Sequence, residues 1–305
     1  MGRDERSRSR AGMTGFGRWQ RTLLIGLPFG WLAVFFLLPL AIVAGISLTE
    51  SADAVPPYTP LWTRTASGIE SHATLASYAA LCQGCLRAYG ESLGYAALAT
   101  ALCLVIGYPV AFAIARSAGI WRQLLLFLVI LPFWTSFLIR VYAWIALLQP
   151  SGLINRTLLS LGLIGEPLPL IYNSFSLELG LVYSYLPFMI LPLFGALSRL
   201  DDSLIEAAAD LGARPFAVFR RIVLPLSLPG IAAGCLLVFI PAVGEFVIPD
   251  LLGGPSTLMI GRVLWQEFFD NVDWPAAAAI AVVLVAILTA PLLLAQRLAE
   301  RERAI

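Results

Sequence analysis

Long stretches without a charged side chain divide this chain of 305 residues. The windows that contain no Asp, Glu, Lys or Arg are 20 to 28 residues long and run over 22–49, 92–115, 179–198, 222–244 and 274–296. A sixth window, 123–149, is interrupted only by Arg140. About 20 apolar residues in a helix cross the hydrocarbon core of a bilayer. The pattern therefore predicts an all-α integral membrane protein with six transmembrane helices.

Proline and glycine punctuate this pattern. A proline near the middle of a helix removes a hydrogen bond and bends it, which predicts kinks in the third, fourth and fifth spans at Pro132, Pro187 and Pro241. The segment 49–90 is rich in Pro, Ser, Thr and Ala and is expected to form an outer loop with short helices. Segment 150–177 has too many breakers to span and is expected to be a second outer loop with a short helix near 153–162.

The charge distribution predicts the orientation of the spans. Only 13% of the residues are charged, about half the share of an average soluble domain, and all 20 basic residues are arginine. If the N-terminus is cytoplasmic, fifteen arginines lie inside and four lie in outer loops, namely Arg64, Arg87, Arg156 and Arg262. Basic residues concentrate on the cytoplasmic side of membrane proteins. Both termini are therefore expected to be cytoplasmic.

The same boundaries divide the chain into four parts. Residues 1–21 form an Arg- and Ser-rich cytoplasmic tail, and 22–90 hold the first span and a long periplasmic loop. Residues 91–297 form a core of five spans, and 298–305 form a second cytoplasmic tail.

A charged segment between the fourth and fifth spans predicts a helix–glycine–helix elbow within 199–228. Ser203 and Glu206 have the spacing of a capping box, so a helix is expected to begin near 203. Gly212 is expected to end it, and Pro215 suits the first turn of a second helix. Two prolines, Pro225 and Pro229, are expected to break the path into the fifth span. An interfacial amphipathic hairpin, with Glu206 only as a cap, is the alternative.

The elbow resembles the signature loop of ABC-importer permeases. That loop reads E-A-A, three residues, Gly, nine residues, I-x-L-P, and it is matched here by Glu206, Ala207, Ala208, Gly212, Ile222, Leu224 and Pro225. In that family it docks into a cleft on a cytoplasmic ATPase and transmits closure of the ATPase dimer. The resemblance implies the ABC type I importer permease (MetI-like) fold, with a cytoplasmic coupling helix in 199–228. It implies Glu206 and Gly212 as the main docking positions.

Further stretches resemble polyamine permeases, most of all the putrescine-type permease that works beside a second, different permease. They are 131–140, 181–189, 234–255 and 258–269, and the similarity covers roughly 90–296. The resemblance implies a polyamine importer of the bacterial inner membrane, for putrescine or spermidine. It implies a cytoplasmic ABC ATPase dimer, a second homologous permease and a periplasmic polyamine-binding protein as partners, and no nucleic acid. ATP and magnesium would be bound by the ATPase, so no cofactor is expected in this chain.

A polyamine carries several ammonium groups, so its path needs carboxylates and aromatic faces. Glu245 lies in the expected fifth span, 229–250, which is otherwise apolar, and an ionisable side chain there is by default a functional candidate. Asp250 follows near the outer mouth, where solvation alone also explains it. Cation–π faces are offered by Trp134, Tyr142, Tyr183 and Tyr185. The hypothesis is that Glu245 and one or more of these aromatics line the path. The alternatives are an ion pair between Glu245 and Arg140, and aromatic rings that pack against lipid or other helices.

Other functions find less support in the residues. Without a lysine the chain has no G-x-x-x-x-G-K-[ST] loop, so the energy must come from a partner or an ion gradient. A proton- or sodium-coupled secondary transporter and an ABC permease for another small solute are the alternatives. A single histidine, His72, leaves little for an enzyme or a metal site, and no catalytic or metal-binding residue is assigned. Cys82 and Cys85 form a C-x-x-C that is interpreted as two thiols or a local disulfide. Cys103 and Cys235 are expected to be small core residues.

Overall fold

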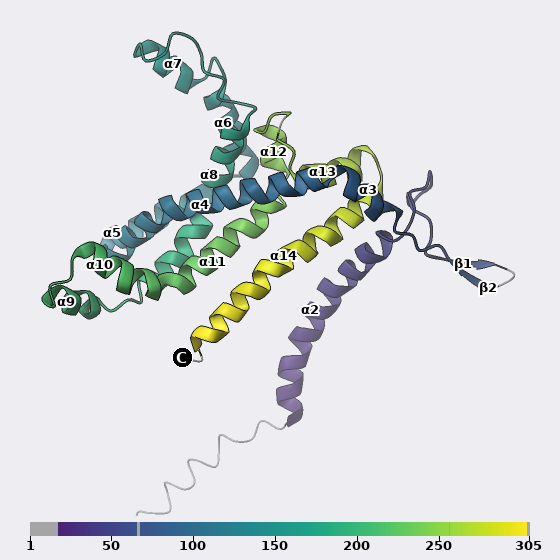
Figure 1. The fold of residues 1–305 in the computed structure, drawn as a ribbon, viewed down its shortest axis with the longest axis horizontal. Helices are drawn as coiled ribbons and strands as arrows, with labels where there is room; N and C mark the ends of the chain where they lie inside the picture. The colour runs from purple at the N-terminus through teal and green to yellow at the C-terminus, as the bar shows by residue number, and fades with distance from the viewer. Residues whose placement is uncertain (1–17, 66–67, 256, 304–305) are drawn as a thin grey trace, which may run out of the picture.

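Three long helices that pack against one another form the centre of the molecule (Figure 1). The computed structural model describes residues 18–65, 68–255 and 257–303. The central helices are α4 (Leu86–Arg116), α8 (Ser174–Leu197) and α11 (Leu224–Val243), and most of the buried side chains lie between them. Helices α2 (Arg18–Ile46) and α14 (Trp274–Arg303) contact each other beside this core. The architecture confirms the expected all-α class.

Small residues let the central helices approach closely. A Cβ atom added at Gly230 of α11 would lie 2.5 Å from Ala196 Cβ of α8, and one at Gly234 would lie 2.7 Å from Met189 Sδ. On α4, Gly107 faces the same methionine at 3.1 Å. Lipid tails are as apolar as the side chains of a membrane helix, so the hydrophobic effect does not drive such helices together. Glycine at the contacts lets the helices approach closely, and the close packing holds them. The three helices therefore form one tightly packed unit.

The third window is broken rather than kinked. Helix α5 (Gly119–Ile130) passes into the 3₁₀ turn η1 (Leu131–Trp134), and after two non-helical residues α6 (Phe137–Leu148) begins. Pro132 lies in that turn, where its missing N–H interrupts the hydrogen-bond ladder. Figure 1 shows α6 and the following α7 (Leu153–Ser160) leaving the central helices. The short helix expected near 153–162 is confirmed.

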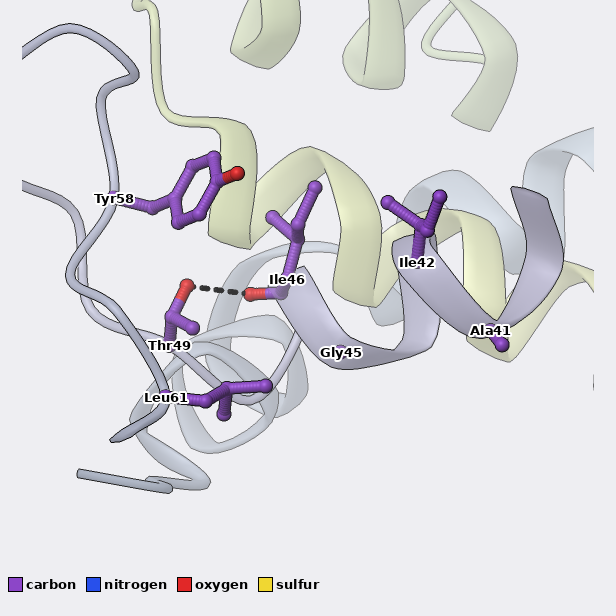
Figure 2. A pocket seen from close by; sticks show the side chains of 7 residues that line it. All are labelled: Ala41, Ile42, Gly45, Ile46, Thr49, Tyr58 and Leu61. Atoms are coloured by element: carbon purple, nitrogen blue, oxygen red, sulfur yellow. Dashed lines mark hydrogen bonds between the residues drawn. The ribbon is translucent and has the colours of Figure 1, made fainter. Parts of the chain in front are cut away.

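The loop after α2 contains both expected and unexpected structure. Helix α3 (Ala76–Gly84) confirms a short outer helix. The antiparallel hairpin of β1 (Trp62–Thr65) and β2 (Gly68–Ser71) was not expected, and it pairs Trp62 with Ser71. Figure 2 shows a pocket of about 340 Å³ where α2 meets this loop, lined by Ala41, Ile42, Gly45, Ile46, Thr49, Tyr58 and Leu61. Its lining has no charged side chain.

Five helical stretches of the described chain are long and apolar enough to cross a membrane. They are Leu23–Ile46, Leu86–Arg116, Phe137–Ser160, Ser174–Leu197 and Pro215–Val243, and two shorter apolar stretches are Gly119–Trp134 and Trp274–Ala290. The last of these belongs to α14, where the sixth span was expected. The chain is a multi-pass membrane protein, and the count of six spans stays a prediction.

The segment between α11 and α14 is held against the start of α4. It contains α12 (Val247–Leu251), α13 (Ile260–Trp265) and the π-helical turn η3 (Gln266–Asp270). The backbone N–H of Leu258 donates to Glu91 Oε2 at 3.0 Å, and that of Ile260 donates to Ser92 Oγ at 2.7 Å. These bonds fix the backbone that approaches the end of α11.

Asn155 secures the loop around α7. Its Nδ2 donates to the carbonyls of Gln149 and Leu168 at 3.2 and 3.0 Å, and its Oδ1 accepts the Leu168 N–H at 2.8 Å. The side chain is fully buried, and each buried group left unpaired costs about 1–3 kcal/mol. Replacing Asn155 by alanine is expected to speed proteolysis within 149–169 about tenfold. Limited proteolysis of the purified protein measures this, and Asn271→Ala on an exposed site is the control. Equal rates for the two variants would contradict it.

Candidate functional site

The expected elbow is present as a helix, a glycine and a second helix. Helix α9 (Asp202–Asp210) is followed by Gly212 at φ 78°, and α10 (Pro215–Val218) starts with its proline in the first turn. The capping-box prediction was wrong, because the cap is Asp201, whose Oδ1 accepts the Ser203 N–H at 3.0 Å. That backbone hydrogen bond lowers the pKa of the Asp201 carboxyl. An aspartate two residues earlier is as good a cap as serine, so the helix begins before Ser203.

The expected break after the elbow is absent. Helix α10 continues through the π-helical turn η2 (Phe219–Val223) into α11, so the chain is helical from Pro215 to Val243. Pro225 lies in the first turn of α11, directly after the wider π turn, and Pro229 lies inside the helix. The predicted interruption at these prolines is therefore wrong. A π turn locally rearranges the backbone hydrogen bonds of a helix. A proline beside such a turn therefore removes fewer of these hydrogen bonds than it would in a regular α-helix.

The elbow presents apolar side chains to its surroundings. Leu211 is 89% exposed and Phe216 is 72% exposed, on either side of Gly212. Four of the signature residues are exposed, namely Glu206, Ala207, Gly212 and Pro225. The other three are partly buried, namely Ala208, Ile222 and Leu224. The exposed pair Leu211 and Phe216 was missed by sequence reasoning, because hydropathy does not show which face is free.

The inner side of the elbow rests on the end of α4. A pocket of about 250 Å³ lies there, with an apolar lining of Phe112, Ile205, Ala209, Ala213, Pro215, Val218, Phe219 and Val223. Arg116, the last residue of α4, forms an ion pair with Asp202 in the first turn of α9. The elbow is thus attached to α4 by a charge pair and to α11 by a continuous helix.

Glu245 lies at a helix break, not inside a span as expected. Helix α11 ends at Val243, and the Glu245 Oε1 accepts the backbone N–H groups of Phe246 and Val247 at 3.1 and 2.9 Å. Its Oε2 accepts the hydroxyl of Tyr185 at 2.5 Å. A Cβ at Gly261 would lie about 2.5 Å from the carbonyl oxygens of Gly244 and Glu245, so that segment closes over the break. The carboxylate is fixed by three donors.

Tyr185 is the one predicted aromatic that the structure brings to Glu245. Tyr185 is buried, whereas Trp134 and Tyr142 are exposed. Tyr183 packs instead on Trp144, with ring centroids 5.4 Å apart. Among the described contacts, these other three rings do not touch Glu245.

The remaining charged candidates have other neighbours. Asp250 is exposed, and its Oδ1 lies 3.3 Å from Arg262 Nε in an ion pair. The Arg140 guanidinium lies over the rings of Phe133 and Phe137, at 5.6 and 5.7 Å. The alternative that Glu245 pairs with Arg140 is therefore not found among the described ion pairs.

The cysteines and the histidine offer no further site in the described part of the chain. Cys103 is buried and Cys235 half-buried, as expected of core residues. The Cys85 thiol is free, and burial, followed by the charge of Glu267, raises its pKa. The side chain of Cys82 lies outside the described residues. His72 Nε2 lies 2.7 Å from Thr63 Oγ1, and no cluster of three metal-ligating side chains occurs among the residues described.

Comparison with known proteins identifies the family of the chain. Residues 104–303 match the model of a family described as the binding-protein-dependent transport system inner membrane component. The chain is 39% identical over 269 residues to the spermidine/putrescine transport system permease protein PotB of Haemophilus influenzae, covering 87% of this chain and 89% of that protein. It is 40% identical over 260 residues to PotB of Escherichia coli, covering 85% and 90%. The chain is 32% identical over 202 residues to the molybdenum transport system permease protein ModB of Mycobacterium bovis, covering 64% of this chain and 73% of that protein.

Solved structures show the same fold. A bacterial ABC transporter involved in the import of alginate has a chain that superposes with a TM-score of 0.69 at 17% identity, covering 93% of this chain and 96% of that one. The MetNI methionine ABC transporter gives 0.55 at 20% identity, covering 73% and 97%. The expected fold of an ABC importer permease is confirmed. The chain therefore belongs to the family of inner membrane components of binding-protein-dependent transport systems, which are permease subunits and not enzymes.

Proposed function

We propose that this chain is the permease subunit through which an ATP-driven importer moves a polyamine across the bacterial inner membrane, with putrescine as the first substrate and spermidine as the second. The observation that carries the substrate is identity of 39–40% over at least 85% of the chain to permeases named for spermidine and putrescine. Permeases named for alginate or methionine transport share the fold at 17–20% identity. The fold alone therefore does not select the substrate.

The elbow is proposed as the site where a separate ATPase dimer docks. It offers exposed apolar side chains at Leu211 and Phe216 beside the signature residues Glu206 and Gly212. Apolar side chains with this exposure are suited to insertion into a cleft on a partner. Because α10 runs on into α11, closure of the ATPase would displace α11 directly. Arg116 and Asp202 would pass the same displacement to α4.

The path is proposed to pass the break between α11 and α12. There the Glu245 carboxylate supplies a negative charge, and Tyr185 and two backbone N–H groups hold it in place. A fixed carboxylate attracts an ammonium group without the cost of ordering a flexible side chain. Asp250, the exposed Trp134 and Tyr142, and the half-buried Tyr183 stay candidates of the outer path.

The proposed assembly follows the orientation given by the arginines. Both termini and the 199–228 elbow would face the cytoplasm, with 22–90 contributing the periplasmic loop and 91–297 the permease core. A second, homologous permease would complete the channel, and a periplasmic polyamine-binding protein would deliver the substrate. One of the alginate structures is a complex with a periplasmic protein bound to an alginate pentasaccharide, which is the arrangement proposed here with a polyamine.

Transport by the reconstituted complex tests the function. The chain would be placed in vesicles with its neighbouring ATPase, second permease and binding protein, and uptake of labelled putrescine would be followed. Uptake is expected to require ATP, to be insensitive to an uncoupler, and to be inhibited by spermidine but not by a neutral sugar.

Each contrary result points to a different alternative. Uptake that an uncoupler abolishes, and that persists without ATP, would indicate a secondary transporter. Absent putrescine uptake, with the ATPase still stimulated by another loaded binding protein, would keep the permease and reject the polyamine.

A further inference from the structure

Glu178 is a buried carboxylate without a described partner. It is the fifth residue of α8 and is 9% exposed. Both Oε1 and Oε2 are buried and accept no hydrogen bond from any described protein group. Sequence analysis overlooked it, because it directly precedes the uncharged window 179–198. A buried carboxylate with no compensating partner is costly, so its presence calls for an explanation.

The packing of α8 places Glu178 in the central core. Cys103 of α4 donates to the carbonyl of Val182, one turn beyond Glu178, with Sγ 3.6 Å from the oxygen. One turn nearer the start of α8, Ser174 Oγ lies 2.8 Å from the hydroxyl of Tyr95 of α4. Ser176, on the opposite face, donates to the carbonyl of Leu252 instead. Glu178 therefore lies where α8 meets the rest of the bundle, and only about 6 Å along the axis from the first residue of the helix.

Five arginines of the described chain lie against other groups. Arg87 pairs with Glu91, Arg116 with Asp202 and Arg262 with Asp250. Arg122 and Arg140 lie over phenylalanine rings. None of the described ion pairs contains Glu178. A cation that pairs with its carboxylate would therefore come from outside the part of the chain that the structure describes.

Glu178 also shares a helix face with the Glu245 site. Tyr185, which holds Glu245, lies seven residues further along α8, and seven residues are almost two full turns. The two Cα atoms are thus about 10 Å apart along the axis, and the side chains of a helix lean toward its N-terminus, which is the direction of Glu178 from Tyr185. Two carboxylates, one held by three donors and one without a partner, lie along one side of α8.

We propose that Glu178 is a second anchor for the transported amine, which binds one ammonium group while Glu245 binds another. The inference rests on the proposed polyamine function and assigns the path a pair of carboxylates for a molecule with two or more positive charges. The ammonium group at Glu178 would donate the hydrogen bonds that this carboxylate lacks within the described chain. The site is closed in this structure, so the amine would reach Glu178 when α8 separates from α4 and α11. The charge of the ammonium group would then offset the free-energy cost of burying the carboxylate again.

Transport by Glu178→Gln tests the proposal. The variant keeps the shape of the side chain and removes its charge, and it would be assembled with the ATPase, second permease and binding protein in vesicles. The maximal rate of putrescine uptake is expected to fall about tenfold or more, while stimulation of the ATPase by the loaded binding protein is kept. Glu178→Asp should retain part of the uptake. Glu166→Gln, on the exposed loop after α7, is the matched control and should transport as the unaltered protein does.

A second measurement needs no substitution at Glu178. Dicyclohexylcarbodiimide, an apolar reagent for carboxyl groups, would be added to the unaltered complex, and adducts on the peptide that contains Glu178 would be quantified by mass spectrometry. ATP with putrescine-loaded binding protein is expected to slow this labelling, compared with ATP and unloaded binding protein. This labelling experiment still tests the proposal if Glu178→Gln fails to fold.

The outcomes separate the inference from the function on which it rests. Normal putrescine uptake by both the unaltered protein and Glu178→Gln would overturn the inference alone, as would labelling that putrescine does not slow. No putrescine uptake by the unaltered complex would overturn the polyamine function. The proposed role of Glu178 would then be rejected as well.

Discussion

Uptake driven by ATP is expected to fall about tenfold or more when Gly212 is replaced by valine, while the permease still inserts and assembles. Gly212 has φ 78°, and a Cβ atom added there meets no atom within 4 Å outside its chain neighbours, so the main cost of the substitution is expected in the backbone. The left-handed conformation costs an L-residue about 1–2 kcal/mol, and more for a β-branched side chain. The backbone would relieve this strain by changing the angle between α9 and α10, and so the position of the docking surface.

A second left-handed glycine provides the matched control. Gly162 has φ 67° and also has no atom within 4 Å of an added Cβ, but it lies after α7, away from the elbow. Gly162→Val carries the same backbone strain and is expected to leave coupling unchanged. The measured quantities are the rate of ATP-driven putrescine uptake and the number of ATP molecules hydrolysed per putrescine imported. Unchanged values of both in Gly212→Val would show that the geometry of the elbow is not required.

Glu245→Gln is expected to lower the maximal rate of putrescine uptake about tenfold or more with little effect on folding. The glutamine carbonyl can accept the N–H groups of Phe246 and Val247, and its amide can face the Tyr185 hydroxyl. The substitution therefore removes the charge and can retain the hydrogen bonds at the break before α12. If the charge draws the ammonium group through the break, transport falls although the local structure is kept.

Two further variants make this result specific. Tyr185→Phe keeps the charge but loses one of its three donors, and a smaller decrease in uptake is expected. Asp270→Asn, at an exposed carboxylate at the end of the π turn η3, should have no effect. Initial uptake rates over a range of putrescine concentrations give both the maximal rate and the half-saturation. If neither changes in Glu245→Gln, Glu245 has no role in the path.

Local chemistry made much of the fold predictable. Uncharged windows coincide with the long helices because a bilayer demands a continuous apolar surface. Gly212 and Pro215 were placed correctly because a left-handed turn and a first-turn proline depend on a few neighbouring residues. The short helix at 153–160 followed from breakers on both sides.

Contacts between distant residues account for what was missed. Glu245 leaves its helix because the segment around Gly261 packs on the break, and that segment is fixed by Glu91 and Ser92. The pairing of Arg116 with Asp202 joins residues that are 86 positions apart, and no local pattern reports it. Hydropathy counted Glu178 as the polar edge of a window, whereas its position on the face of α8 is set by packing against α4. Composition and hydropathy do not show which neighbour each side chain faces, and for this reason these contacts could not be predicted.

The unbroken helix from Pro215 to Val243 gives the molecule a mechanical lever. Its 29 residues make a rod about 43 Å long, with the elbow at one end and the Glu245 break at the other. A tilt of about 5° about one end of such a rod moves its far end by about 4 Å, which is comparable with the diameter of a methylene chain. A change at the docking surface can thus open or close the region around Glu245 through rigid rotation, without a relay of side-chain rearrangements between them.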